Sequence, residues 1–102
     1  MSAQETLQKL QIMEQNLHSA AQQKQQFQAQ LFELEGALKE LQTAKTAYKL
    51  VGGILIHTDN ATLKSELESK KEIVELRVQT LEKQEKQLKE KAKKLQESVV
   101  SE

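Results

Sequence analysis

The 102-residue sequence has no cysteine, no proline and no tryptophan, and only 3% of its residues are aromatic. The absence of cysteine excludes a disulfide framework and a thiolate site. The absence of proline removes the residue that breaks helices, while the shortage of aromatic side chains argues against a thick globular core. Glu, Lys, Gln, Leu and Ala dominate instead, a composition typical of long helices and coiled coils. We therefore expect a mainly α protein.

The chain also lacks an excess of charge and a long apolar segment. Its 15 Lys and Arg residues balance its 15 Asp and Glu residues, which argues against dependence on polyanions or acidic membranes. The longest apolar run, residues 50–56, is far too short to span a bilayer, and the first ten residues contain no continuous apolar run like that of a signal peptide. The default expectation is a cytoplasmic protein with no nucleic-acid or membrane partner.

Apolar residues recur with a helical period before and after the middle of the chain. From Leu10 to Leu41 the spacings alternate between three and four, and only Lys24 interrupts the row. Such a row, called the seam below, is the face that packs against a partner helix in a coiled coil. A second, weaker seam has Leu or Val at every seventh residue from Leu67 to Leu95, with mixed partner positions that include Lys64 and Glu85. The patterns predict helices over residues 5–43 and 60–98.

The segment AYKLVGGILIHTD, residues 47–59, separates the two seams. Gly-Gly between apolar runs predicts a two-residue type I′ turn, because both turn positions need positive φ. Folding the chain about this pair brings the two seams together, with Leu17 facing Leu88 and Lys24 opposite Leu81. We therefore predict an antiparallel two-helix coiled coil joined by a β-hairpin over residues 46–58.

The predicted hairpin carries apolar residues on both faces and has two unpaired edges. The register places Val51 opposite Ile54 and Tyr48 opposite His57. One adjoining coiled coil could cover only one face, and open strand edges favour pairing with another chain. The hairpin is therefore interpreted as an oligomerisation element. The residues assigned to it are Tyr48, Leu50, Val51, Gly52, Gly53, Ile54, Leu55 and Ile56.

The sequence offers no support for an enzyme. His18 and His57 are far apart and belong to no cluster of metal ligands, so no catalytic residue, metal or cofactor is expected. Gly52-Gly53 lacks the pattern of a phosphate-binding loop. Residues 83–94 hold six lysines and two glutamates, which suits either an electrostatic patch or, as we favour, a solvated helix face.

Two stretches, AYKLVGGILIHTDNATLKSELESKKEIVELRVQTLEKQEKQL and QQKQQFQAQLFELEGALKELQ, resemble the beta-type subunits of prefoldin. The resemblance covers nearly the whole chain and implies one domain over residues 1–102. It implies a hexameric, ATP-independent co-chaperone whose hairpins join alpha-type subunits and other beta-type copies in a β-barrel. It also implies that coiled-coil tips bind non-native polypeptides for delivery to a group II chaperonin.

Apolar residues near the two chain ends are the candidates for binding such clients. From the residues alone, seam packing at frayed helix ends is the favoured explanation, but the resemblance favours an adaptable apolar clamp, in which methionine helps the surface to re-pack. The predicted client-binding residues are Leu7, Leu10, Ile12, Met13, Leu95, Val99 and Val100. The main alternative is a structural coiled-coil adaptor that dimerises in trans, and a weaker one is a nucleic-acid-binding helix.

Overall fold

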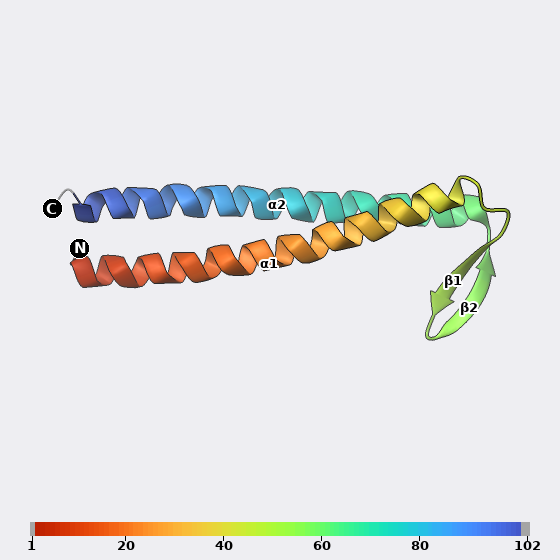
Figure 1. Ribbon diagram of the computed structural model, residues 1–102, viewed down its shortest axis with the longest axis horizontal. Coiled ribbons are helices and arrows are strands. Elements are labelled where there is room, and N and C mark those ends of the chain that lie inside the picture. The colour runs from red at the N-terminus through yellow and green to blue at the C-terminus, as the bar shows by residue number, and fades with distance from the viewer. Residues whose placement is uncertain (1, 101–102) are drawn as a thin grey trace. The chain divides into compact units, whose positions relative to one another are not determined.

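The computed structural model describes residues 2–100, except for the side chains of Val99 and Val100. Helix α1 (Ala3–Leu41) is followed by strands β1 (Ala47–Val51) and β2 (Ile54–Thr58) and by helix α2 (Asn60–Val100) (Figure 1). The predicted fold class, mainly α with one hairpin between two long antiparallel helices, is confirmed. Assembly of the hairpin into a β-barrel stays a prediction.

Helix α1 begins at Ala3, two residues before the predicted start, because Ser2 caps it. The Ser2 Oγ accepts a hydrogen bond from the Glu5 amide at 3.2 Å, and the Ser2 carbonyl accepts one from the Thr6 amide at 3.1 Å. A serine followed three residues later by glutamate is a known start signal for helices, so the sequence contained this information.

Helix α1 ends at Leu41, two residues before the predicted end. The amides of Gln42 and Thr43 donate to carbonyls three residues back, at 3.2 and 3.3 Å. Bonds of this spacing tighten the last turn of a helix, and the chain leaves the helical path there. Helix α2 begins at Asn60, the first residue of the helix predicted over residues 60–98. Asp59 caps it, since its Oδ2 accepts a hydrogen bond from the Thr62 backbone amide at 3.1 Å.

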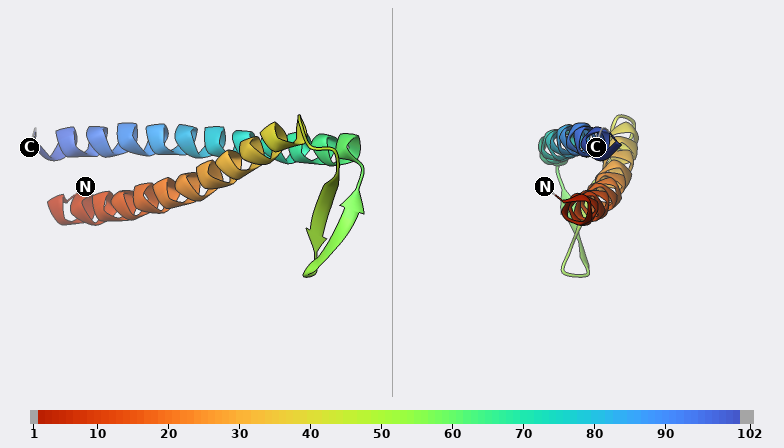
Figure 2. Two further views of the ribbon diagram at one scale, coloured as in Figure 1. Left: turned by 45° about the vertical axis from the view of Figure 1, so that its right-hand side comes forward. Right: turned by 90° about the vertical axis from the view of Figure 1, so that its left-hand side faces the viewer.

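The chain divides into two compact units, which are described separately. The terminal unit contains residues 1–26 and 77–102, and the hairpin unit contains residues 27–76. Within each unit the segments of α1 and α2 run antiparallel, and the hairpin belongs to the second unit (Figure 1, Figure 2).

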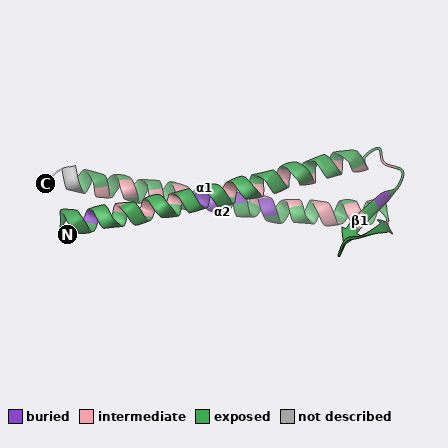
Figure 3. Ribbon diagram, turned by 60° about the horizontal axis from the view of Figure 1, so that its bottom comes forward, coloured by how far each residue is buried: buried purple, intermediate pink, exposed green. Residues whose placement is uncertain are grey.

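Burial follows the predicted seams (Figure 3). Between Leu10 and Leu41 every seam residue is buried or half-buried, and every other residue is exposed. In α2, Val74, Val78 and Leu81 are the most deeply buried seam residues. The heptad periodicity of the sequence therefore identified the helix faces that pack together.

The second seam departs from the prediction at the start of α2. Lys64, assigned to the seam from the heptad spacing, is exposed, whereas Leu63 is half-buried. Two contacts with preceding segments hold this end of the helix. The side-chain nitrogen Nδ2 of Asn60 donates to the Ala44 carbonyl, and Lys49 pairs with Glu66. The heptad spacing does not predict these two contacts, and they are made where Leu63 rather than Lys64 is covered.

The hairpin has the predicted register and turn. Val51 pairs with Ile54 and Tyr48 with His57 in an antiparallel ladder. Gly52 and Gly53 have φ values of 54° and 80°, in the left-handed region that a type I′ turn requires. A Cβ added at either glycine would meet no atom within 4 Å, so backbone conformation alone favours glycine here.

Candidate binding surfaces of the hairpin and the helix ends

The hairpin exposes nearly all of its apolar side chains. Leu50, Ile54 and Leu55 are 67%, 65% and 69% exposed, and Tyr48, Val51 and Ile56 are also exposed. The sequence analysis allowed the neighbouring helices to cover one face, but the structure leaves the large apolar side chains of both faces exposed. A concentrated apolar surface of this kind on a small protein marks an interaction site.

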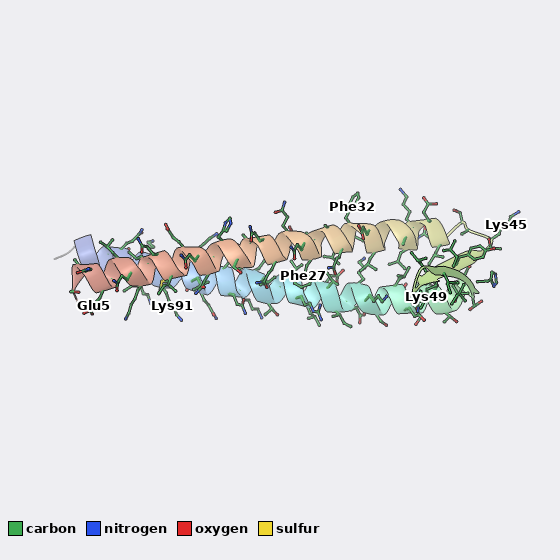
Figure 4. All side chains as sticks on the ribbon, turned by 90° about the horizontal axis from the view of Figure 1, so that it is seen from below. Glu5, Phe27, Phe32, Lys45, Lys49 and Lys91 are labelled. Carbon is green, nitrogen blue, oxygen red and sulfur yellow. The ribbon has the colours of Figure 1, made fainter. Side chains whose placement is uncertain are left out.

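The base of the hairpin is fixed to the rest of the hairpin unit. Ala47 is buried, and the Asn60 side-chain amide donates to the Ala44 carbonyl at 2.7 Å. Lys49 Nζ lies 2.9 Å from Glu66 Oε2 on α2 (Figure 4). The hydrogen bond from Lys49 and its positive charge lower the pKa of Glu66. These contacts anchor the strands at one end and leave the turn end of the hairpin exposed.

One hairpin face has an aromatic pair of its own. The rings of Tyr48 and His57 lie 5.5 Å apart in a T-shaped arrangement with an interplanar angle of 77°. Because side chains alternate along a strand, this pair shares its face with Leu50 and Leu55. Cross-strand aromatic contacts of this kind help a short hairpin to keep its shape before a partner binds.

Near the chain ends, the predicted client-binding residues fall into three groups. Leu7 and Ile12 are 56% and 55% exposed, so their side chains are free to contact a client. Leu10, Met13 and Leu95 are half-buried in the seam and face the neighbouring helix. The side chains of Val99 and Val100 lie outside the described residues.

Thr6 is the seam residue that the sequence analysis missed. It is 4% exposed and lies seven residues before Met13, so the heptad spacing would have identified it. Its Oγ1 donates to the Ser2 carbonyl at 3.0 Å, which satisfies the buried hydroxyl. In the first turn of α1 the seam position is therefore occupied by a small polar residue, Thr6, and Leu7 lies outside the seam.

An ion pair occupies the interruption in the first seam. Lys24 Nζ lies 2.8 Å from Glu85 Oε1, and both side chains are largely covered. The interaction with Glu85 raises the pKa of Lys24. The sequence register placed Lys24 opposite Leu81, and the long lysine side chain instead reaches a glutamate one helical turn away. A charged pair inside an otherwise apolar seam favours one alignment of the two helices over shifted ones.

The described residues contain no group of three or more His, Cys, Asp or Glu side chains placed to hold a metal ion. His18 lies 3.2 Å from the Gln22 side chain on the same helix, and His57 packs edge-on against Tyr48. Across residues 2–100, no helix has the length and apolar content needed to span a membrane.

Comparison with known proteins identifies the family. The family model for the prefoldin subunit matches residues 4–101. The chain belongs to the prefoldin beta-subunit family. The prefoldin subunit beta of Thermococcus onnurineus is 39% identical over 84% of this chain and 77% of its own length. That of Thermoplasma volcanium is 38% identical over 94% of this chain and 81% of its own.

A solved structure agrees with this assignment. The crystal structure of the prefoldin beta subunit from Thermococcus strain KS-1 matches with a TM-score of 0.90 and 37% sequence identity, over 96% of this chain and 89% of that one. A prefoldin subunit is a non-enzymatic chaperone component that assembles with other prefoldin subunits. The exposed hairpin and the exposed residues near the chain ends are thus candidate surfaces for assembly and for client binding.

Proposed function

We propose that this chain is the beta-type subunit of a hexameric, ATP-independent holdase. Its hairpin joins alpha-type subunits and other beta-type copies in a β-barrel, and apolar residues near the chain ends bind non-native polypeptides. The complex then delivers these clients to a group II chaperonin. The protein works in the cytoplasm.

The observation that carries the proposal is the uncovered hairpin. Its base is anchored by Ala47 and by the pair of Lys49 with Glu66. Its large apolar side chains are exposed, and in the described part of the chain no further strand pairs with either of its edges. An isolated two-stranded sheet is marginally stable in water, so pairing with further strands would stabilise it. This supports assembly through the hairpin.

Client binding is supported by the exposure of Leu7 and Ile12 on the first turns of α1. Isolated apolar residues give weak contacts, which suit clients without a fixed shape and allow their release. Several subunits would present several such contacts at once, and the combined affinity would exceed that of each one. No nucleotide is needed for holding of this kind.

Suppression of client aggregation tests the holding function. The assembled complex is mixed with chemically denatured citrate synthase, and light scattering is followed for the unmodified chain and for the variant Leu7→Ser with Ile12→Ser. We expect at least about a tenfold loss of apparent affinity, because two apolar contacts are removed. Phe32→Ser is the matched control, since Phe32 is 80% exposed and points away from α2 (Figure 4).

A structural adaptor would behave differently in the same assay. If the complex formed by the unmodified chain does not reduce scattering, and removal of residues 1–12 and 96–102 changes nothing, the holding function is wrong. The adaptor hypothesis would then be the better account of the chain.

A further inference from the structure

Among the grooves on the described part of the terminal unit are two of different chemistry. One, here called the amide groove, has a volume of about 370 Å³, and the other, the charged groove, about 290 Å³. The amide groove is lined by Asn16, Ser19, Ala20, Gln23, Leu81, Gln84, Gln87, Leu88 and Lys91. The charged groove is lined by Lys24, Glu82, Glu85, Lys86, Lys89 and Glu90.

The amide groove exists because Ala20 stands in the seam where larger residues stand elsewhere. Ala20 and Leu81 are buried and Leu88 is half-buried, so the lining of the amide groove includes covered apolar surface. The small alanine side chain leaves a hollow that neighbouring leucines do not fill. A hollow of this volume is within the range in which proteins bind small ligands or a few residues of a peptide.

Four carboxamides line the groove, two from each helix. Gln23 Nε2 donates to Ser19 Oγ at 3.2 Å, which leaves the Gln23 oxygen available. Asn16, Gln84 and Gln87 make no side-chain hydrogen bond to another described residue, and all three are exposed. Donors and acceptors beside a partly apolar floor are therefore ready to bind a ligand.

A carboxamide matches a peptide bond, because each has an N–H donor and a C=O acceptor. It is neutral, so it does not select for charged side chains and does not carry the cost of desolvating an ion. In the charged groove, in contrast, every lining residue is charged, and Lys24 is bound to Glu85 at 2.8 Å. Of these two grooves, the amide groove is the one that suits a ligand recognised through its backbone.

We propose that the amide groove binds the backbone of an extended segment of non-native polypeptide. This proposal rests on the holding function proposed above and adds a second contact to the apolar residues near the chain ends. The carboxamides exchange hydrogen bonds with peptide groups of the client, and Lys91 donates to client carbonyls. Recognition through the backbone makes holding independent of client sequence.

Replacement of two amides by side chains of similar length tests the groove. The variant Gln84→Met with Gln87→Met removes hydrogen bonding but keeps volume, and Gln25→Met with Gln79→Met is the matched control outside the groove. Each is assembled with its partner subunits, and the Kd for fluorescein-labelled, reduced and carboxymethylated α-lactalbumin is measured by anisotropy. Circular dichroism verifies that helix content is the same.

We expect the groove variant to bind the probe at least about fivefold more weakly than the control, from the loss of hydrogen bonds. Unchanged or tighter binding by the groove variant overturns the proposal, and tighter binding would show that the groove prefers apolar groups. If the unmodified complex does not bind the probe at all, the holding function fails and the groove proposal fails with it. If the unmodified complex binds and the groove variant binds equally well, the groove proposal alone fails.

Discussion

The two units of this prefoldin beta-type chain use the same two helices but present different surfaces. Twelve of the fifteen glutamines lie within residues 1–26 and 77–102. Of the eleven large apolar side chains that are exposed in the described part of the chain, nine lie in the hairpin unit and only Leu7 and Ile12 in the terminal unit. Dense apolar surface suits lasting assembly, whereas neutral polar surface with a few apolar residues suits weak and reversible contacts.

The difference is a matter of what surrounds the seam. Both units have apolar seam residues at heptad spacing, and in both these residues are buried or half-buried. The hairpin unit adds a β element whose large apolar side chains its own helices leave exposed, while the terminal unit adds carboxamides. A repeating helix pair can therefore serve two purposes when residues outside its seam differ.

The largest effect is expected from charging the hairpin. Leu50→Glu with Leu55→Glu should abolish assembly, because burial of each leucine is worth about 1.5–3 kcal/mol and a buried unpaired carboxylate adds a further cost. Native mass spectrometry with alpha-type subunits measures the outcome. Phe32→Glu, on an exposed helix face of the same unit, should leave the assembly intact. Full-size complexes from the leucine variant would contradict the assignment of the hairpin.

A smaller effect is expected from truncation of a seam residue. Leu81→Ala should lower the free energy of unfolding by about 2–4 kcal/mol, because it leaves a cavity in a packed interface. Leu76→Ala, at a position that is 61% exposed, should change it by about 0.5 kcal/mol or less. Urea unfolding followed by circular dichroism compares the two variants. Equal losses would mean that α2 does not bury the seam described above.

Replacement of glycine by alanine should have opposite effects on stability in the helix and in the turn. Gly36→Ala should stabilise α1 by about 1 kcal/mol, because alanine has the higher helix propensity. Gly53→Ala should destabilise the hairpin by about 1–2 kcal/mol, because alanine disfavours the φ of 80°. Neither new methyl group meets an atom within 4 Å. Urea unfolding reports the first change and amide exchange of residues 47–58 the second; effects of equal sign would exclude this backbone explanation.

The smallest effect is expected from acid pH, which weakens the ion pair of Lys49 with Glu66 at the base of the hairpin. The pKa of Glu66 is lowered in the folded chain by Lys49, with a lesser contribution from Lys70. The stability that the ionised Glu66 contributes to the fold is therefore present above the unfolded pKa. It is lost as pH falls through the lowered folded pKa. An NMR titration should therefore show hairpin amides shifting at acid pH. Glu66→Gln should remove this step, and an unaltered titration in that variant would assign the step to another group.

Much of the fold is predictable from local rules. The seam from Leu10 to Leu41 follows from spacing alone, because burial of one helix face requires a period near 3.6 residues. The register of the hairpin follows from Gly52-Gly53, because a two-residue turn fixes which residues pair. The cap at Ser2 was equally readable from the sequence and was overlooked.

Other features depend on contacts between distant residues. Lys24 pairs with Glu85, one helical turn from the residue that the register places opposite it, because the long lysine side chain can reach that far. Leu63 replaces Lys64 at the start of the second seam, where Asn60 and Glu66 contact segments before and within the hairpin. The amide groove depends on the volume of Ala20 relative to its neighbours across the interface. Spacing rules on one helix contain none of this information.

The division of roles between the two units is the central claim, and hydrogen–deuterium exchange of the intact chain tests it most directly. When alpha-type subunits are added, amide protection should rise in residues 47–58 and stay unchanged in residues 3–12. When carboxymethylated α-lactalbumin is added to the assembled complex, protection should rise in residues 3–23 and 81–95, with no further change in the hairpin. Protection that appears in the hairpin on addition of the client, with none in the terminal unit, would contradict the account.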